Sequence, residues 1–136
     1  MKKIFLIVFS LIILSSCGSQ KQVTEKLSEH IELMDNEKLL LAARANYQAK
    51  LFAQPGRLFL TNQRVYFRTS KWATKKFEFS LQFSDIAEVK KTGYNLKLGL
   101  GASLNSFKII LKDDTKRIFV TGRKKSWISG VTKLIK

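Results

Sequence analysis

Residues 56–67 read Gly-Arg-Leu-Phe-Leu-Thr-Asn-Gln-Arg-Val-Tyr-Phe, and this stretch decides the fold prediction. Apolar runs, which are typical of buried β-strands, stand on both sides of the polar segment Thr61–Arg64. Asn62 favours a turn there because its side chain can hydrogen-bond the local backbone. The stretch therefore predicts two strands, 57–60 and 65–68, joined as a hairpin.

The chain on both sides of this hairpin alternates between apolar and polar residues, as half-buried strands do. Pro and Gly in Gln54–Gly56 predict a turn, and residues 39–51 are read either as a first strand or as a junction between a helix and a strand. Lys112–Lys116 is typical of a hairpin turn. The further strands that we predict are 77–83, 86–89, 94–100, 107–111 and 117–120.

Two segments have the apolar spacing of helices instead. A short stripe runs from Val23 to Met34, and a second one from Trp127 to Ile135 ends the chain. About seven strands, a short N-terminal helix and a C-terminal helix predict a mainly β (α+β) fold. We expect a small barrel, which has no exposed strand edges. The C-terminal helix should plug one open end of the barrel and bury Trp127.

The first residues have the features of a signal peptide. Lys2 and Lys3 precede an apolar run at 4–14, which is shorter than the roughly 17–25 residues that a membrane-spanning helix needs. Leu14-Ser15-Ser16-Cys17 resembles the lipobox of bacterial lipoproteins, and Cys17 is the only Cys of the chain. The resemblance implies cleavage before Cys17 and attachment of diacylglycerol to its sulfur, which would anchor the protein to a membrane. The alternative is an ordinary secretory signal.

This reading divides the chain into a signal peptide (1–16), a segment with the lipidated Cys17, a tether and a short helix (17–36), and one domain (37–136). It predicts a location in the cell envelope, outside the cytoplasm, with the choice between inner and outer membrane open. The net charge is +15, and residues 39–136 hold most of it. Export disfavours a nucleic-acid partner, so we expect anionic lipid, an envelope polymer or an envelope protein. Alternatively, the basic residues only keep the surface soluble.

Residues 56–67 also resemble the signature of GRAM domains and their bacterial pleckstrin-homology-like relatives, which has an apolar strand, Thr-Asn, Arg and an apolar-aromatic strand. Phe83–Val89, Phe107–Val120 and Trp127–Ile135 match later parts of that pattern in order. The resemblance covers roughly residues 37–135 and implies a pleckstrin-homology (PH) barrel. Members of this family bind phosphoinositides, other anionic lipids or protein segments, so the resemblance alone does not choose a ligand.

Lipid-binding PH domains carry basic residues on the first and third loops between strands. The corresponding residues here are Lys50 in the first loop region, and Arg68, Lys71, Lys75 and Lys76 in the third. They are the candidate anion-binding residues, and Trp72 among them suits a membrane interface. The dense Lys-x-Arg-x-Arg pattern of strong phosphoinositide binders is missing, which leaves a merely solvated loop as the alternative. A second basic patch, Arg123–Lys125, precedes the C-terminal helix.

The sequence offers little for catalysis or cofactor binding. With one His, His30, and one Cys, it lacks a zinc ligand set of the usual type. Asp113-Asp114 is read as part of a turn, and Gly99–Gly101 lacks the Lys-Ser/Thr of a phosphate loop. We therefore predict a non-enzymatic binding module without metal or cofactor. The alternatives are an envelope lipoprotein that binds a peptide or partner subunit, and a small hydrolase with an unrecognised active site.

Overall fold

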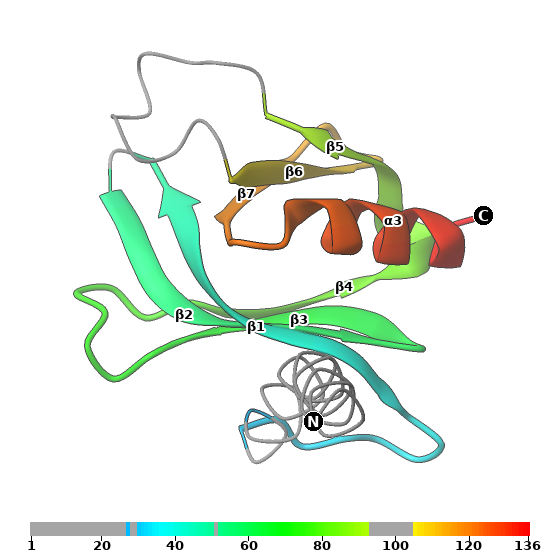
Figure 1. Ribbon diagram of the computed structural model, residues 1–136, viewed down its shortest axis with the longest axis horizontal. Helices are drawn as coiled ribbons and strands as arrows, with labels where there is room; N and C mark the ends of the chain where they lie inside the picture. The colour runs from blue at the N-terminus through cyan, green and yellow to red at the C-terminus, as the bar shows by residue number, and fades with distance from the viewer. Residues whose placement is uncertain (1–26, 28–29, 51, 93–104) are drawn as a thin grey trace, which may run out of the picture.

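The computed structural model describes residues 27, 30–50, 52–92 and 105–136 (Figure 1). Within these ranges the chain forms seven strands, a short 3-10 helix and a C-terminal α-helix. The elements are β1 (Leu39–Ala49), β2 (Phe52–Thr61), β3 (Arg64–Thr69), β4 (Glu78–Gln82), η1 (Phe83–Asp85), β5 (Ile86–Lys91), β6 (Ser106–Leu111), β7 (Lys116–Val120) and α3 (Lys124–Leu134).

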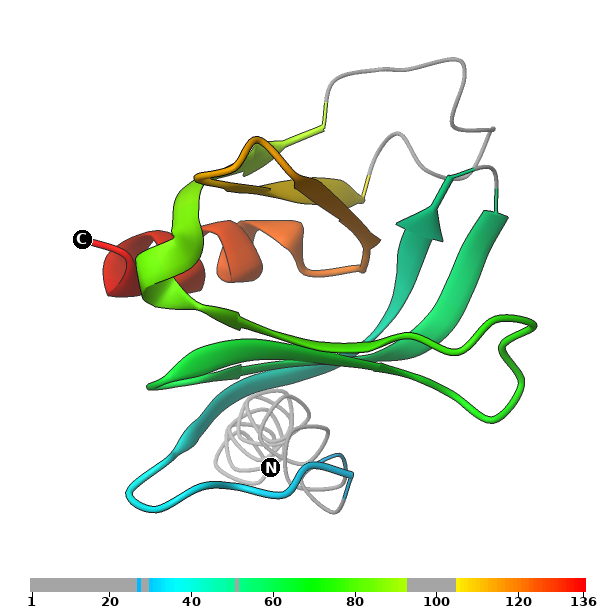
Figure 2. The ribbon, with the colours of Figure 1, turned by 180° about the vertical axis from the view of Figure 1, so that it is seen from behind.

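The strands form one antiparallel sheet in the order β4-β3-β2-β1-β7-β6-β5. The long strand β1 pairs with both β2 and β7, and in this way it connects two layers of the sheet (Figures 1 and 2). β4 and β5 are not paired with each other, so the sheet is not closed. The predicted mainly β fold with a C-terminal helix is confirmed, whereas the predicted closure that would remove the strand edges is wrong.

The helix α3 packs between the two layers of the open sheet (Figures 1 and 2). Figures 1 and 2 show α3 beside the layer of β5, β6 and β7, on the side that faces the other layer. Trp127 and Val131 on this helix belong to the same buried cluster as Ile86 and Leu60. Side chains of the helix therefore fill the space at the open side of the sheet, where a closed barrel would have backbone hydrogen bonds. Trp127 is 2% exposed, as predicted for the plugging helix.

Alternation along the strands builds the core, because successive side chains of a strand point to opposite faces. Leu58 and Leu60 of β2 and Val65 and Phe67 of β3 all point inward and are buried. Phe67 also belongs to an aromatic cluster in this core, together with Tyr47, Phe79, Phe107, Phe119 and Trp127. Burial of each large apolar side chain stabilises the fold by about 1.5–3 kcal/mol.

A second, smaller apolar cluster lies on the opposite face of the sheet, which we call the outer face. Leu27, Ala42, Phe59 and Tyr66 are buried together there, and Ile31 packs against them. The segment before β1 thus covers part of the outer face. This contact brings His30 near the side chains of β2 and β3, where one of the cavities described below lies.

The predicted turn at Gln54–Gly56 is wrong, because these residues lie inside β2. The chain turns earlier, at Lys50, which has a φ of 55°. Pro55 is tolerated because it lies just beyond the β2–β3 ladder, where its carbonyl accepts a 2.8 Å hydrogen bond from the Ser70 N–H. At Gly56 a Cβ atom would lie 2.5 Å from the Arg68 carbonyl oxygen, so close approach of β3 requires glycine.

The other strand predictions that fall on described residues are confirmed, with ends shifted by a few residues. Residues 39–51, for which strand and helix–strand junction were both open, form the strand β1. The helix predicted at 127–135 begins earlier, at Lys124. The strand predicted at 94–100, the signal peptide and Cys17 lie outside the described residues, as do residues 23–26, 28 and 29 of the helix predicted at 23–34. In the described part of that segment Leu27 is helical but residues 30–34 are not, so the helix prediction is wrong there. The Met34 N–H donates a hydrogen bond to the Glu37 carboxylate and not to a helical carbonyl. Among the described residues, no helix has the length and hydropathy to span a membrane.

Candidate functional site

A cavity of about 890 Å³ lies between the β1–β2 turn and the β3–β4 loop (residues 70–77). We call it the loop pocket. Its walls include Lys50 and Phe52 from the first hairpin, and Lys75 and Lys76 from the loop. Arg117 of β7 also lines it. No carboxylate is among the described side chains that line this pocket, so its electrostatic potential is positive and favours an anion.

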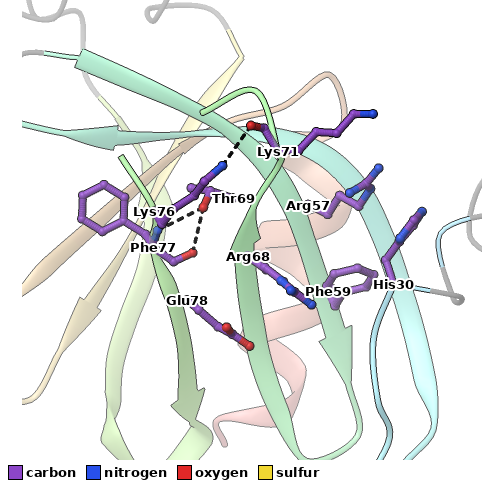
Figure 3. Close-up of a pocket in the computed structure, with 9 residues that line it drawn as sticks. All are labelled: His30, Arg57, Phe59, Arg68, Thr69, Lys71, Lys76, Phe77 and Glu78. Atoms are coloured by element: carbon purple, nitrogen blue, oxygen red, sulfur yellow. Dashed lines mark hydrogen bonds between the residues drawn. The ribbon is translucent and has the colours of Figure 1, made fainter. Parts of the chain in front are cut away.

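A second cavity of about 500 Å³ lies on the outer face of β2, β3 and β4, and Figure 3 shows its lining. We call it the outer-face pocket. It is lined by Arg68, Lys71 and Lys76, which the sequence had suggested, and by Arg57 and His30, which it had not. In Figure 3, Arg57, Arg68 and His30 lie around the ring of Phe59.

The five predicted basic residues therefore do not form a single site. Lys50 and Lys75 line the loop pocket, while Arg68 and Lys71 line the outer-face pocket. Lys76 lines both, but its ammonium donates hydrogen bonds to the carbonyl oxygens of Ser70 (2.9 Å) and Lys71 (3.0 Å). Lys76 thus also holds the β3–β4 loop in shape, and its charge is only partly available to a ligand.

Arg117 is the residue of the loop pocket that sequence reasoning missed. It donates a 2.7 Å hydrogen bond to the Tyr47 hydroxyl, and its guanidinium lies 4.7 Å from the ring centroid of Phe79. Its Nε is buried and has no hydrogen-bond partner. A signal was available in the sequence, because Arg117 has the same parity along β7 as the buried Phe119 and must therefore point inward.

Buried polar contacts fix the shape of the β3–β4 loop. The Gln54 side chain is 2% exposed, and its Oε1 accepts hydrogen bonds from the Thr74 hydroxyl and the Lys75 N–H, both at 3.1 Å. The Phe77 N–H donates to the Thr69 hydroxyl at 3.0 Å. These bonds hold Lys75 and its neighbours in place before any ligand arrives, which lowers the entropy cost of binding.

Two aromatic side chains are unusually exposed, Phe52 in the lining of the loop pocket and Trp72 in the lining of another cavity, of about 540 Å³. Phe52, which follows the β1–β2 turn, is 69% exposed, and Trp72 in the β3–β4 loop is 79% exposed. The Lys71 ammonium lies 5.0 Å from the centroid of the Trp72 ring. Exposed aromatic rings beside basic side chains are suited to the interface between a membrane and water.

The outer-face pocket contains one carboxylate, that of Glu78. Glu78 accepts a hydrogen bond from the Tyr66 hydroxyl. Burial, together with this hydrogen bond and the nearby negative charge, raises the pKa of Tyr66 to about 12. The tyrosine therefore stays protonated and keeps donating to Glu78 at physiological pH.

The second basic patch of the sequence, Arg123–Lys125, is divided by the fold. Arg123 lines a further cavity of about 450 Å³ together with Arg44, Arg57 and Trp127.

Asp113-Asp114 lies in the β6–β7 turn, as predicted, and the Asp113 carboxylate accepts a 2.9 Å hydrogen bond from the Thr115 N–H. The described residues contain no group of three or more potential metal ligands.

The seven-stranded antiparallel sheet with its C-terminal helix defines a PH-like fold. The C-terminal domain of an unknown protein from Leishmania infantum is similar, with a TM-score of 0.60 and 14% identity over 87% of this chain and 95% of that chain. The PH domain of Slm1 in complex with phosphoserine matches with a TM-score of 0.54 and 15% identity over 71% of this chain and 95% of that one. The same domain in complex with inositol-4-phosphate matches with 0.52 and 14% over 71% and 96%.

Within this class the chain belongs to the GRAM domain family, whose model matches residues 25–119. The match includes the hairpin at 56–67, on which the sequence-based resemblance depended. No curated protein sequence matches the chain significantly. At 14–15% identity the solved structures establish the fold alone.

Proposed function

We propose that this protein is a non-enzymatic membrane-binding module whose loop pocket receives phosphate-bearing headgroups of anionic lipids. The observation that carries the proposal is the set of cations around this pocket: Lys50, Lys75 and Lys76 at the rim and Arg117 deeper inside, with no carboxylate among the described lining residues. The complexes of the Slm1 PH domain with phosphoserine and inositol-4-phosphate support a phosphate-bearing ligand for this fold.

The chemistry of the lining suits such a headgroup. Lysine ammonium groups are compact point charges that bind phosphate from several directions. The Arg117 guanidinium has an unpartnered, buried Nε, and a phosphate oxygen that reached it would satisfy this donor. Each basic residue near an anionic membrane surface contributes about 1 kcal/mol. Phe52 and Trp72, both exposed, would enter the interfacial region when the headgroup is bound.

Cys17 supplies the second membrane contact in this proposal. Acylation of Cys17 would hold the domain at the surface of a membrane in the cell envelope, outside the cytoplasm. Tethering raises the effective concentration of lipid at the loop pocket, so the pocket would be occupied even if it binds the headgroup weakly. Mass spectrometry of the mature protein tests the anchor. A diacylated N-terminal Cys17 is expected, and an unmodified full-length chain would refute this part of the proposal.

A tethering assay tests the loop pocket. The full chain is placed in neutral phosphatidylcholine vesicles, and its capture of a second population that contains phosphatidylglycerol is followed by energy transfer between the two. Lys50→Gln/Lys75→Gln should weaken capture roughly 30-fold, which corresponds to about 1 kcal/mol for each charge. Capture should also fall steeply between about 50 and 150 mM salt, since surface electrostatic attraction is screened.

A matched control separates a specific pocket from general positive charge. Lys112→Gln/Lys133→Gln removes the same charge from exposed lysines outside the loop pocket. The control should retain most of the capture. Equal losses in the two double variants would contradict a specific pocket, and capture that is insensitive to salt would favour the peptide-binding alternative.

A further inference from the structure

Three arginines lie next to one another across the outer face of the sheet. In the strand register, Arg44 of β1 is opposite Arg57 of β2, and Arg57 is opposite Arg68 of β3. We call this set the arginine row. Neighbouring strands are about 4.8 Å apart, so the row crosses roughly 10 Å of the sheet. The core residue Leu58 adjoins Arg57 in sequence and points to the inner face, which places the row opposite the core.

This arrangement opposes stability. Like charges directly opposite each other on adjacent strands repel and destabilise the pairing. No hydrogen bond or ion pair joins the guanidinium of Arg44, Arg57 or Arg68 to another side chain of the described residues. The Nε of Arg57 is buried and unsatisfied, which adds a further cost. At one end of the row Glu78 of β4 is opposite Arg68 and offsets part of its charge. Arg57 has only Arg44 and Arg68 opposite it, so its charge calls for an explanation outside folding.

The surroundings of Arg57 provide space for a ligand. Arg57 lines the outer-face pocket, the cavity of about 450 Å³ beside Arg123, and a third cavity of about 540 Å³ that Trp72 also lines. Arg44 lines the last two of these, and Arg68 the first. Around the row, the described residues supply additional cations, and the only lining carboxylate, that of Glu78, already accepts the Tyr66 hydroxyl.

We propose that the arginine row is a second anion site, separate from the loop pocket, that binds a phosphate-bearing ligand with Arg57 at its centre. The planar guanidinium presents N–H groups as a fork that matches two oxygens of a phosphate. Adjacent forks from Arg44 and Arg68 suit a ligand that carries more than one negative charge. Bound phosphate would neutralise the repulsion along the row and give the Arg57 Nε an acceptor. Figure 3 shows Arg57 and Arg68 on the same side of the sheet.

Two probes test this site on the full chain in neutral detergent micelles. Pyrophosphate, titrated calorimetrically, represents a soluble phosphate. Dansyl-labelled phosphatidylglycerol in the micelles represents a lipid headgroup and is followed by energy transfer from tryptophan. Arg57→Gln should weaken binding of at least one probe by about tenfold or more, as expected from loss of a charge-assisted hydrogen bond. The probe that is affected identifies the source of the phosphate.

Thermal unfolding provides an independent measurement. Because Arg57→Gln relieves repulsion within the row, its Tm without ligand should equal or exceed that of the wild type. The ligand should raise the Tm of the wild type and have little effect on the variant. Lys133→Gln, which removes one charge from an exposed position on α3, is the matched control and should bind like the wild type.

Several results would overturn the site. One is that Arg57→Gln binds both probes as tightly as the control does. Another is that Arg57→Gln lowers the Tm while the wild type binds neither probe, which would mean that the guanidinium has a structural partner. The Lys50→Gln/Lys75→Gln variant separates this inference from the proposed function. It should lose vesicle capture and keep the effect of Arg57 on probe binding, so either proposal can fail alone.

Discussion

The Nε of Arg64 donates a 2.9 Å hydrogen bond to the buried carboxylate of Glu37, and this ion pair connects the segment before β1 to the β2–β3 hairpin. The same carboxylate accepts the Thr61 hydroxyl at 2.6 Å and the Met34 N–H at 2.8 Å. Next to it, the Asn62 side chain accepts the Lys38 N–H at 2.7 Å. The Thr-Asn-x-Arg part of the signature at 56–67 therefore clamps the N-terminal segment onto the sheet, and it does not line the loop pocket.

Removing the charge of Glu37 should destabilise the protein. Glu37→Gln keeps the size of the side chain but leaves the largely buried Arg64 guanidinium without its charged acceptor. Hydrogen bonds to charged groups contribute about 1.5–3 kcal/mol, so a loss of about 2 kcal/mol is expected. Denaturant unfolding measures it. Glu88→Gln, which breaks the exposed pair with Lys90, should cost less than about 1 kcal/mol, and similar losses in both variants would contradict the clamp.

Stability should also fall in acid through Glu37. Burial alone would raise the pKa of this carboxyl, but hydrogen bonds from Arg64, Met34 and Thr61 lower it below the ordinary value of 4.5. The unfolded chain therefore takes up the proton first as the pH falls. The contribution of Glu37 is complete above about pH 4.5 and is lost as the pH drops through the lowered folded-state pKa.

Thermal unfolding between pH 7 and pH 2 measures this dependence. Glu37→Gln should have a flatter profile in acid than the wild type, because it has no proton to take up at this position. Some acid dependence should remain, since the hydrogen bond from the Thr115 N–H also lowers the pKa of Asp113. Parallel profiles for the two proteins would show that Glu37 titrates normally.

Gly56→Ala should be strongly unfavourable. The added Cβ would lie 2.5 Å from the Arg68 carbonyl oxygen and 2.5 Å from the Phe67 ring, and backbone at this distance cannot yield cheaply. Overpacking of this kind typically costs about 1–3 kcal/mol. Gly122→Ala is the control, because a Cβ there meets no atom within 4 Å. Urea unfolding should show a lower midpoint for Gly56→Ala and little change for Gly122→Ala.

The two tryptophans should have opposite roles. Trp127 is 2% exposed and stacks on Phe107 with ring centroids 6.2 Å apart, so Trp127→Ala should cost about 3–5 kcal/mol of stability. Trp72 is 79% exposed, and Trp72→Ala should leave the Tm unchanged and weaken capture of phosphatidylglycerol vesicles. Unfolding and vesicle capture measured on both variants test this contrast. If Trp72→Ala captured vesicles as well as the wild type does, Trp72 would not take part in the proposed membrane contact.

Much of the fold was predictable because its signals are local. The hairpin at 56–67, the β6–β7 hairpin and the C-terminal helix follow from apolar periodicity and turn residues within a few positions. The turn prediction at Gln54–Gly56 was wrong because Pro and Gly also occur inside strands. Gly occurs there where the backbone of the neighbouring strand approaches closely, which only the strand pairing reveals. Local sequence patterns likewise could not predict that β4 and β5 remain unpaired.

The candidate site was predicted only in part. Lys50, Lys75 and Lys76, which the resemblance to lipid-binding PH domains had suggested, line the loop pocket. Arg117 was missed because it is 70 residues from its partner Tyr47, and Arg44, Arg57 and Arg68 were not recognised as a row. The sequence had placed Arg68 and Lys71 with Lys75, although Arg68 and Lys71 line the outer-face pocket and Lys75 lines the loop pocket.

By itself the sequence determined which segments are extended, where the main hairpins turn and that the domain is cationic, because each of these properties depends on neighbouring residues and composition. Only the tertiary structure decided that Glu37 meets Arg64 and that three arginines meet on one face. Those contacts depend on strand register and on which face each side chain takes. A shift of one residue in the register would send every side chain of a strand to the opposite face.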